Sequence, residues 1–136
     1  MRRIFIEQTL TEKYPRININ EHPWHQVICH TEFGPGWHDL IIELFQKIIE
    51  IYNKNGIDIL ELKIDTLKEK YGGLRVYVRT SIPEIHDLLI EYENKAEEIC
   101  EECGKPGSLH EDLSIGWLYT VCNECASIFG YKKVED

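Results

Sequence analysis

The clearest pattern of hydrophobic and polar positions lies between residues 37 and 54. Hydrophobic residues recur there at intervals of three and four, and polar residues occupy the opposite side, as in an amphipathic helix. The hydrophobic positions are Trp37, Leu40, Ile41, Leu44, Phe45, Ile48 and Tyr52. Gly34-Pro35-Gly36 precedes the segment and Gly56 follows it, which favours a helix from Trp37 to Lys54.

The following segment changes to a period of two, which is typical of β-strands. Leu60, Leu62 and Ile64 alternate with polar residues as far as Asp65. A second alternating run covers residues 74–79, with Leu74, Val76 and Val78 as its hydrophobic positions. The joining residues 68–73 contain two glycines, so the sequence predicts a hairpin.

Two further helices are indicated. Ser81-Ile82-Pro83-Glu84 fits a capping box, and the hydrophobic stripe that follows leads directly to Cys100. That stripe consists of Ile82, Ile85, Leu89, Tyr92, Ala96 and Ile99. Residues 4–13 predict a short helix that ends before Tyr14-Pro15. Residues 16–36 are irregular, with Gln26–Cys29 as their one strand candidate, and they form either a lid or a packed loop.

Four of the five cysteines stand in two pairs with metal-ligand spacing. Cys100 and Cys103 form the first pair, and Cys122 and Cys125 form the second. In a cytosolic chain this spacing predicts a tetrahedral zinc site, with thiol–disulfide chemistry and an iron–sulfur cluster as the alternatives. Four cysteines fill every coordination position of Zn²⁺, so its expected role is structural. Residues 117–121 predict a strand that leads into the second pair.

These elements together predict an α+β fold. We expect a small antiparallel hairpin or sheet, packed with two amphipathic helices, in a domain covering residues 1–99. A zinc ribbon covering residues 100–136 is expected to pack on that domain. The fifth cysteine, Cys29, is interpreted as a buried hydrophobic residue, with a reactive thiol as the alternative.

Composition and charge narrow the function classes. The 136 residues carry 15 basic and 24 acidic side chains, a formal charge of −9, and both expected domains are acidic. This balance argues against general nucleic-acid binding, whose affinity comes mainly from neutralised phosphates. No apolar run is long enough to cross a bilayer, and no apolar segment follows the basic start, so a cytoplasmic protein without a membrane partner is expected.

The expected hairpin is a basic segment in this acidic chain and a candidate binding site. Residues 61–79 hold five basic and three acidic side chains. An anionic, nucleotide-like ligand would have its phosphate held by Lys68, Lys70, Arg75 and Arg79. Its base would stack on Tyr71, Tyr77 or Trp37, and Gly72 and Gly73 would allow close contact. The alternative is a cross-strand charge ladder with Glu61, Lys63 and Asp65.

Two weaker candidates remain. The start of the long helix, residues 34–39, could bind an anion at its free backbone N–H groups, unless Asp39 satisfies them. The histidines His22, His25, His30 and His38, with Cys29 among them, match no recognised ligand spacing and are interpreted as scattered loop residues. Enzymatic activity is not expected, because neither a Gly-x-Ser-x-Gly nor a His-Glu-x-x-His motif is present.

The motifs together resemble a family of small proteins encoded by bacteriophages and prophages. The resemblance covers most of the chain and rests on Gly36-Trp37-His38-Asp39-Leu40-Ile41, on Lys68-Glu69-Lys70-Tyr71-Gly72-Gly73-Leu74-Arg75 and on the four-cysteine segment. It implies a phage origin and action in the host cytoplasm. Small acidic phage proteins often act by occupying something that the host needs, so the resemblance favours a sponge for an antiviral defence signal. The alternative is a zinc-ribbon adaptor that docks on a host protein. A nucleic-acid-binding ribbon is a further alternative, which the acidic charge of residues 100–136 disfavours. A homo-oligomer is compatible with each of these functions.

Overall fold

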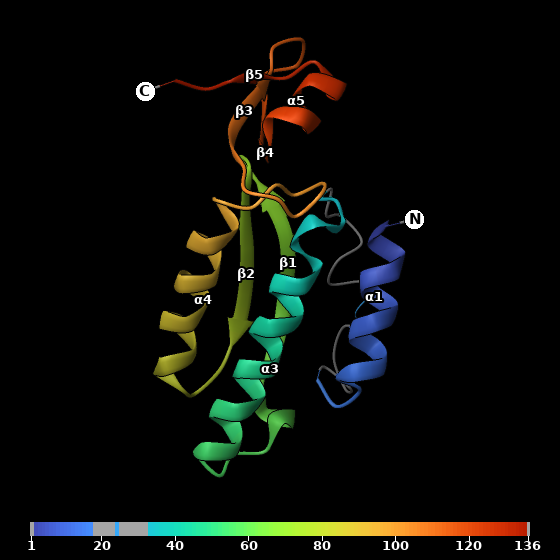
Figure 1. The fold of residues 1–136 in the computed structure, drawn as a ribbon. Coiled ribbons are helices and arrows are strands. Elements are labelled where there is room, and N and C mark those ends of the chain that lie inside the picture. The colour runs from blue at the N-terminus through green and yellow to red at the C-terminus, as the bar shows by residue number, and fades with distance from the viewer. Residues whose placement is uncertain (1, 18–23, 25–32, 136) are drawn as a thin grey trace.

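The computed structural model describes residues 2–17, 24 and 33–135, and they adopt the expected α+β fold. Among these residues, four helices of more than one turn, α1, α3, α4 and α5, combine with two small antiparallel sheets (Figure 1). The bounds in chain order are α1 Arg2–Lys13, η1 Pro35–Trp37, α3 His38–Lys54, η2 Ile59–Glu61, β1 Lys63–Lys70, β2 Gly73–Arg79, α4 Pro83–Ala96, β3 Ser108–Asp112, β4 Trp117–Val121, α5 Asn123–Phe129 and β5 Lys132–Lys133. No helix in the described part of the chain could span a membrane.

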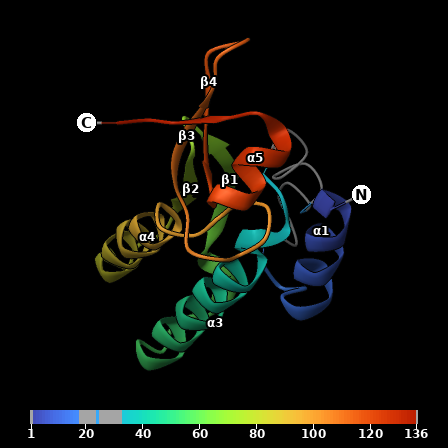
Figure 2. The same ribbon diagram turned by 45° about the horizontal axis from the view of Figure 1, so that its top comes forward.

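Helices α3 and α4 cover one face of the β1–β2 sheet, and α1 lies beside α3 (Figures 1 and 2). The predicted stripe of α3 is buried in this core, where Trp37, Phe45 and Tyr52 have no exposed surface. From α4, Ile85, Leu89 and Tyr92 face the same core, joined by Leu67, Leu74 and Val76 from the sheet. Removing this apolar surface from water is the main driving force for the packing.

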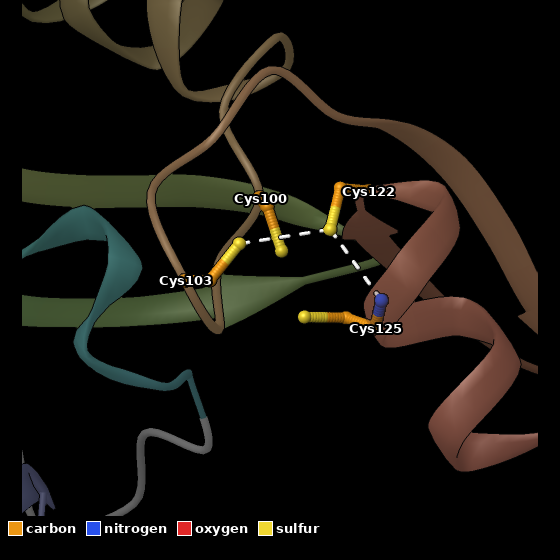
Figure 3. A group of neighbouring side chains, drawn as sticks. All are labelled: Cys100, Cys103, Cys122 and Cys125. Atoms are coloured by element: carbon orange, nitrogen blue, oxygen red, sulfur yellow. Dashed lines mark hydrogen bonds between the residues drawn. The ribbon is translucent and has the colours of Figure 1, made fainter.

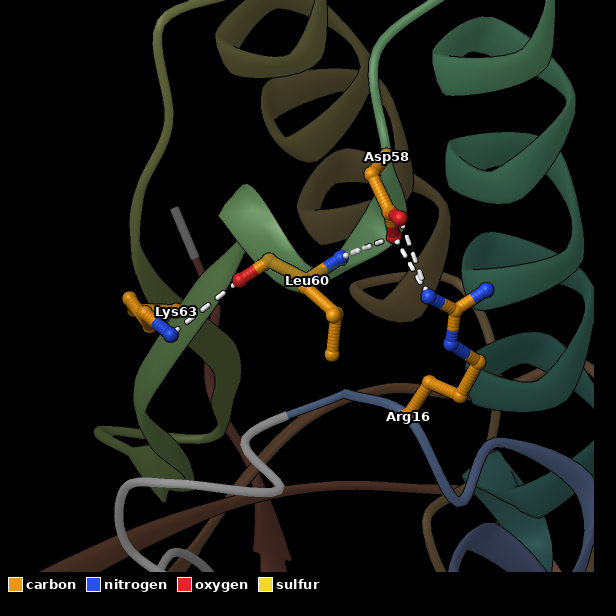
Figure 4. A network of polar contacts seen from close by, with 4 residues as sticks. All are labelled: Arg16, Asp58, Leu60 and Lys63. Carbon is orange, nitrogen blue, oxygen red and sulfur yellow. Dashed lines mark hydrogen bonds and ion pairs between the residues drawn. The ribbon is translucent and has the colours of Figure 1, made fainter.

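The first strand begins three residues later than the sequence predicts. Residues 59–61 form the 3₁₀ turn η2, because the Asp58 carboxylate accepts a hydrogen bond from the Leu60 N–H at 3.0 Å and so favours a turn over a strand. The same carboxylate binds the Arg16 guanidinium at 2.9 and 3.0 Å, and Lys63 Nζ donates to the Leu60 carbonyl at 3.1 Å (Figure 4). These contacts hold the chain after α1 against the start of β1.

The hairpin turn is shorter than the predicted joining segment. Strand β1 continues through Lys70, which pairs with Gly73, so the turn consists of Tyr71 and Gly72 alone. Both residues have positive φ, 54° and 80°, which is the geometry of a type I′ hairpin turn. A bulge at Asp65 shifts the register at the far end of the sheet.

Helix α4 begins without the predicted capping box. Its N-cap is Ile82, which makes no side-chain capping hydrogen bond. The Ser81 N–H donates instead to Glu61 Oε1 at 2.7 Å, and Glu84 pairs with Lys54 at 3.3 Å. Contacts with η2 and α3 therefore replace the local cap.

The C-terminal residues form a second, smaller unit, which we call the cysteine module (residues 99–135). Its sheet has the order β4-β3-β5, and β4 follows the predicted bounds of 117–121. Helix α5, which was not predicted, begins within the second cysteine pair, with Cys122 as its N-cap. The module lies at the end of the β1–β2 hairpin where the Tyr71–Gly72 turn is found (Figure 1).

Candidate metal centre and hairpin surface

The four paired cysteines converge on one point. The sulfur atoms of Cys100, Cys103, Cys122 and Cys125 all lie within 4.8 Å of one another (Figure 3). Among the described residues this is the one group of three or more His, Cys, Asp or Glu side chains close enough to hold a metal ion. Four thiolates suit a tetrahedral, thiophilic ion, and they leave no coordination position open for water or substrate.

The two pairs are positioned by different local structures. Cys100 and Cys103 lie in a tight knuckle that Gly104 closes, since its N–H donates to the Cys100 carbonyl at 2.9 Å and its φ is 82°. Cys122 is the N-cap of α5, and Cys125 lies in the first turn of that helix. The Cys125 N–H donates to Cys122 Sγ at 3.4 Å, and this bond is the main reason that the pKa of Cys122 falls to about 7. The helix start thus favours the thiolate form of Cys122, whereas burial raises the pKa of Cys125 in the same turn.

The knuckle occupies the start of the long helix, so the anion site considered there as a weaker candidate is not formed. The Gly36 N–H donates to the Glu101 carbonyl at 2.8 Å, and Trp37 Nε1 donates to the Ile99 carbonyl at 2.9 Å. A Cβ on Gly36 would lie 2.0 Å from the Cys100 carbonyl oxygen. Trp37 is fully buried, and the expectation that it stacks a ligand base is therefore also wrong.

Glu101 connects the knuckle to strand β4. Its backbone N–H donates to the Thr120 carbonyl at 2.9 Å, and its carboxylate accepts from the Thr120 N–H at 3.1 Å. The side chain is 1% exposed, and this burial raises its pKa to about 9. Glu101 thus satisfies both the N–H and the C=O of Thr120 on the edge of β4, as a neighbouring strand would.

The outer face of the β1–β2 sheet carries most of the basic side chains predicted to bind phosphate. Lys68 and Arg75 are direct cross-strand partners, and Tyr77 follows two residues after Arg75. Lys68 Nζ lies 5.5 Å from the centre of the Tyr77 ring, and Lys70 Nζ lies 5.6 Å from that of Tyr71. Within the described chain neither Lys68 nor Arg75 has a carboxylate partner.

The alternative prediction of a charge ladder holds at one position. Arg79 binds Asp65, with Nη2 3.1 Å from a carboxylate oxygen and Nε at 3.2 Å from both. Glu61 lies in η2 and accepts from Tyr52 and Ser81, and Lys63 Nζ donates to a backbone carbonyl. Arg79 is therefore already paired, whereas Lys68 and Arg75 keep their charge on the open face.

Gly72 makes its close contact with the cysteine module rather than with open space. Thr120 Oγ1 donates to the Gly72 carbonyl at 2.5 Å, and a Cβ on Gly72 would lie 2.7 Å from Leu109 Cδ1. Gly73 is buried beside the Arg75 side chain. The small size of Gly72 therefore serves the contact between hairpin and module, and the close contact of Gly72 and Gly73 with a ligand stays a prediction.

Two pockets of about 220 Å³ each flank this contact. One is lined by four of the predicted ligand-binding residues and by three others, namely Tyr71, Gly72, Gly73, Arg75, Glu97, Leu109 and Thr120. The other is lined by Glu69, Lys70, Tyr71, Gly116, Trp117 and Leu118. The residues of the cysteine module in both pockets were not predicted, because nothing local indicates that they meet a hairpin so much earlier in the chain.

Of the four histidines considered together, the structure describes His38. It is buried at the start of α3, with its ring edge-on to Phe33 at 6.3 Å, and burial lowers its pKa while the nearby Asp39 raises it. His22, His25, His30, Cys29 and the strand candidate 26–29 lie outside the described residues.

Comparison of the chain with known protein families, with curated proteins and with solved structures finds no match.

Proposed function

We propose that this protein is a non-enzymatic binder of an anionic, nucleotide-like ligand, and that one structural Zn²⁺ holds its cysteine module together. Four cysteine sulfurs within 4.8 Å suit Zn²⁺, which prefers a closed tetrahedral site of this type in structural roles. A module of this size buries little core of its own, as Val121, Ala126 and two cysteines are its buried apolar residues. Zinc binding of about 10–16 kcal/mol would supply the missing stability.

The placement of Lys68 opposite Arg75 is the observation that carries the ligand proposal. Two cations that face each other across a strand pair repel, and this costs stability unless an anion lies between them. A guanidinium and an ammonium on one open face offer several donors to a phosphate group. A pocket that Arg75 lines adjoins these two cations. The protein's net charge of −9 argues for a small anion rather than a long nucleic acid.

The resemblance to phage-encoded proteins suggests where such a ligand would come from. In our proposal the protein acts in the host cytoplasm and sequesters a nucleotide signal of antiviral defence. Binding without turnover is sufficient for that role, because lowering the free concentration of the signal is enough to silence its receptor.

Substitution of Arg75 tests this proposal. We expect Arg75→Ala to weaken the binding of ADP and of inorganic pyrophosphate at least about tenfold, because a charge-assisted contact is lost. The melting temperature should change little, since the one hydrogen bond of the guanidinium among the described residues is to the Leu74 carbonyl, at 3.0 Å. Isothermal titration calorimetry measures the affinities, and native mass spectrometry counts zinc and any adduct carried from the cell.

Arg79→Ala is the matched control for this experiment. It removes the same charge from the same strand, but Asp65 already neutralises that charge, so a smaller loss of affinity is expected. Equal losses in the two variants would point to general electrostatic attraction. Unchanged affinity in a folded Arg75→Ala protein would refute the proposal.

A protein-interaction adaptor is a second candidate function, favoured by exposed apolar side chains on the cysteine module. Leu113, Ile115 and Trp117 lie at the β3–β4 turn and are 64%, 57% and 53% exposed, and Ile128 on α5 is 77% exposed. Tyr119 is less available, because its ring stacks on Tyr131 at 4.7 Å. Under this hypothesis no small ligand binds, and Trp117→Ala or Ile128→Ala abolishes capture of a host protein.

A further inference from the structure

Tyr71 occupies a backbone position that does not suit its side chain. Its φ of 54° makes it the one non-glycine residue with positive φ in the described chain. The first position of a type I′ turn favours asparagine, aspartate or glycine, because a larger residue is strained there. The Tyr71 ring is nevertheless 72% exposed and fills no core. Because no core packing of the Tyr71 ring compensates for this backbone strain, the strain points to a role in binding.

A second exposed aromatic side chain lines the same pocket as Tyr71. Trp117, at the start of β4, is 53% exposed and comes from the cysteine module. The pocket that contains both rings has a volume of about 220 Å³. This is smaller than the roughly 300–1,000 Å³ of pockets for drug-sized ligands, and it suits a single planar ring system.

The pocket also offers a backbone donor and acceptor. Strand β4 is at the edge of its sheet, and the Thr120 N–H and C=O both point away from β3, toward Glu101. Because these groups alternate in direction along a strand, those of Leu118 face the same edge. Leu118 lines the pocket, and its N–H and C=O have no partner among the described residues.

We infer that this pocket binds the base of a mononucleotide, with Tyr71 and Trp117 as its stacking residues. Exposed aromatic rings bind bases through their flat faces, and the Leu118 N–H and C=O can hydrogen-bond to a base edge. Lys70, whose Nζ lies beside the Tyr71 ring, provides a cation for the attached phosphate. The inference rests on the proposed function for the phosphate, and it adds a base site that the cysteine module helps to form.

The intrinsic fluorescence of Trp117 provides the readout of the test. Trp24 and Trp37 are 4% and 0% exposed, so quenching by a solute reports mainly on Trp117. We expect the four common nucleoside 5′-monophosphates to quench the fluorescence saturably, purines more strongly than pyrimidines, because their stacking area is larger. Adenosine should quench as well, whereas pyrophosphate should bind in calorimetry without quenching.

Two variants locate the base. Tyr71→Asn keeps the turn geometry. It should lower the affinity for AMP, measured by quenching, at least about tenfold, whereas the affinity for pyrophosphate should change little. Leu113→Ala is the control, since it removes an exposed apolar side chain from the same β3–β4 turn outside the pocket and should leave AMP binding unchanged.

The outcomes separate the base site from the proposed function. AMP that binds without quenching, and with the same affinity in Tyr71→Asn, would overturn the base site and leave the phosphate site standing. Adenosine quenching that depends on Tyr71, without any binding of pyrophosphate, would support the base site and refute the phosphate site. A single-stranded oligonucleotide that binds far more tightly than every monophosphate would overturn the assignment to a free nucleotide.

Discussion

At the residue scale, the turn residues Tyr71 and Gly72 show two different reasons for an unusual backbone conformation. Gly72 needs both its positive φ and its lack of a Cβ, because Leu109 and Thr120 lie against it. Tyr71 gains nothing comparable from its surroundings in the free protein. At Tyr71 the strained backbone lowers the stability of the fold, whereas the exposed ring is available to bind a ligand, so stability and binding favour different residues there.

Replacement of Tyr71 should therefore stabilise the protein. We expect Tyr71→Asn to raise the free energy of unfolding by about 1 kcal/mol, because asparagine tolerates a left-handed backbone better than tyrosine does. Urea denaturation followed by circular dichroism measures the change. Tyr77→Asn is the comparison, since Tyr77 is also exposed but lies in regular β2, and it should not stabilise. A loss of stability in Tyr71→Asn would mean that the ring makes contacts that outweigh the strain.

At the scale of elements, the knuckle and the start of α3 form one joint. The backbone of Gly36 passes so close to Cys100 and Glu101 that a side chain has no space there. We expect Gly36→Ala to destabilise the protein by about 3 kcal/mol, because the added Cβ would overlap the Cys100 carbonyl and weaken the hydrogen bond from the Gly36 N–H to the Glu101 carbonyl. Thermal denaturation measures the effect.

Gly56→Ala controls for the loss of a glycine in this experiment. Gly56 follows α3 with a φ of 65°, and a Cβ there would meet nothing within 4 Å. Its cost should therefore be limited to about 1 kcal/mol of backbone strain. Equal destabilisation by the two substitutions would show that the joint tolerates a side chain and that the contact is loose.

The elements that the sequence predicted correctly are those whose information is local. The stripe of α3 and the cysteine spacing can be read directly, because helix periodicity and metal ligation each involve residues a few positions apart. Helix α5 escaped prediction because Ile128 and Phe129 are exposed and leave it without an amphipathic pattern. The start of β1 was misplaced because the hydrogen bond that the Asp58 carboxylate accepts from the Leu60 N–H overrides an alternating pattern.

The candidate site was predictable only in part for the same reason. The basic residues of the hairpin share one segment, so their common face followed from strand geometry. The burial of Trp37 against the Ile99 carbonyl and the contact of Gly72 with Thr120 join residues 62 and 48 positions apart. Such long-range contacts depend on how the cysteine module docks, and no local pattern encodes that arrangement.

At the scale of the whole molecule, the cysteine module and the hairpin depend on each other. Each pocket at their junction is lined by residues of both. Strand β4, which provides Trp117 and Leu118, ends at Val121, next to Cys122. In our proposal, a Zn²⁺ ion held by the four cysteines keeps the cysteine module folded and so keeps Trp117 and Leu118 opposite Tyr71. Binding of a ligand at this junction should be linked to metal occupancy.

Removal of the metal tests this dependence. Under reducing conditions, a strong zinc chelator should lower the melting temperature and abolish the quenching of Trp117 by AMP, and added Zn²⁺ should restore both. The affinity for Zn²⁺ should also fall as the pH is lowered, because protons compete with the metal for the four thiolates. Cys125→Ser should reproduce the loss, whereas Ser127→Ala, on the same short helix but outside the cluster, should not. AMP quenching that survives complete removal of zinc would show that the hairpin forms the base site without the module.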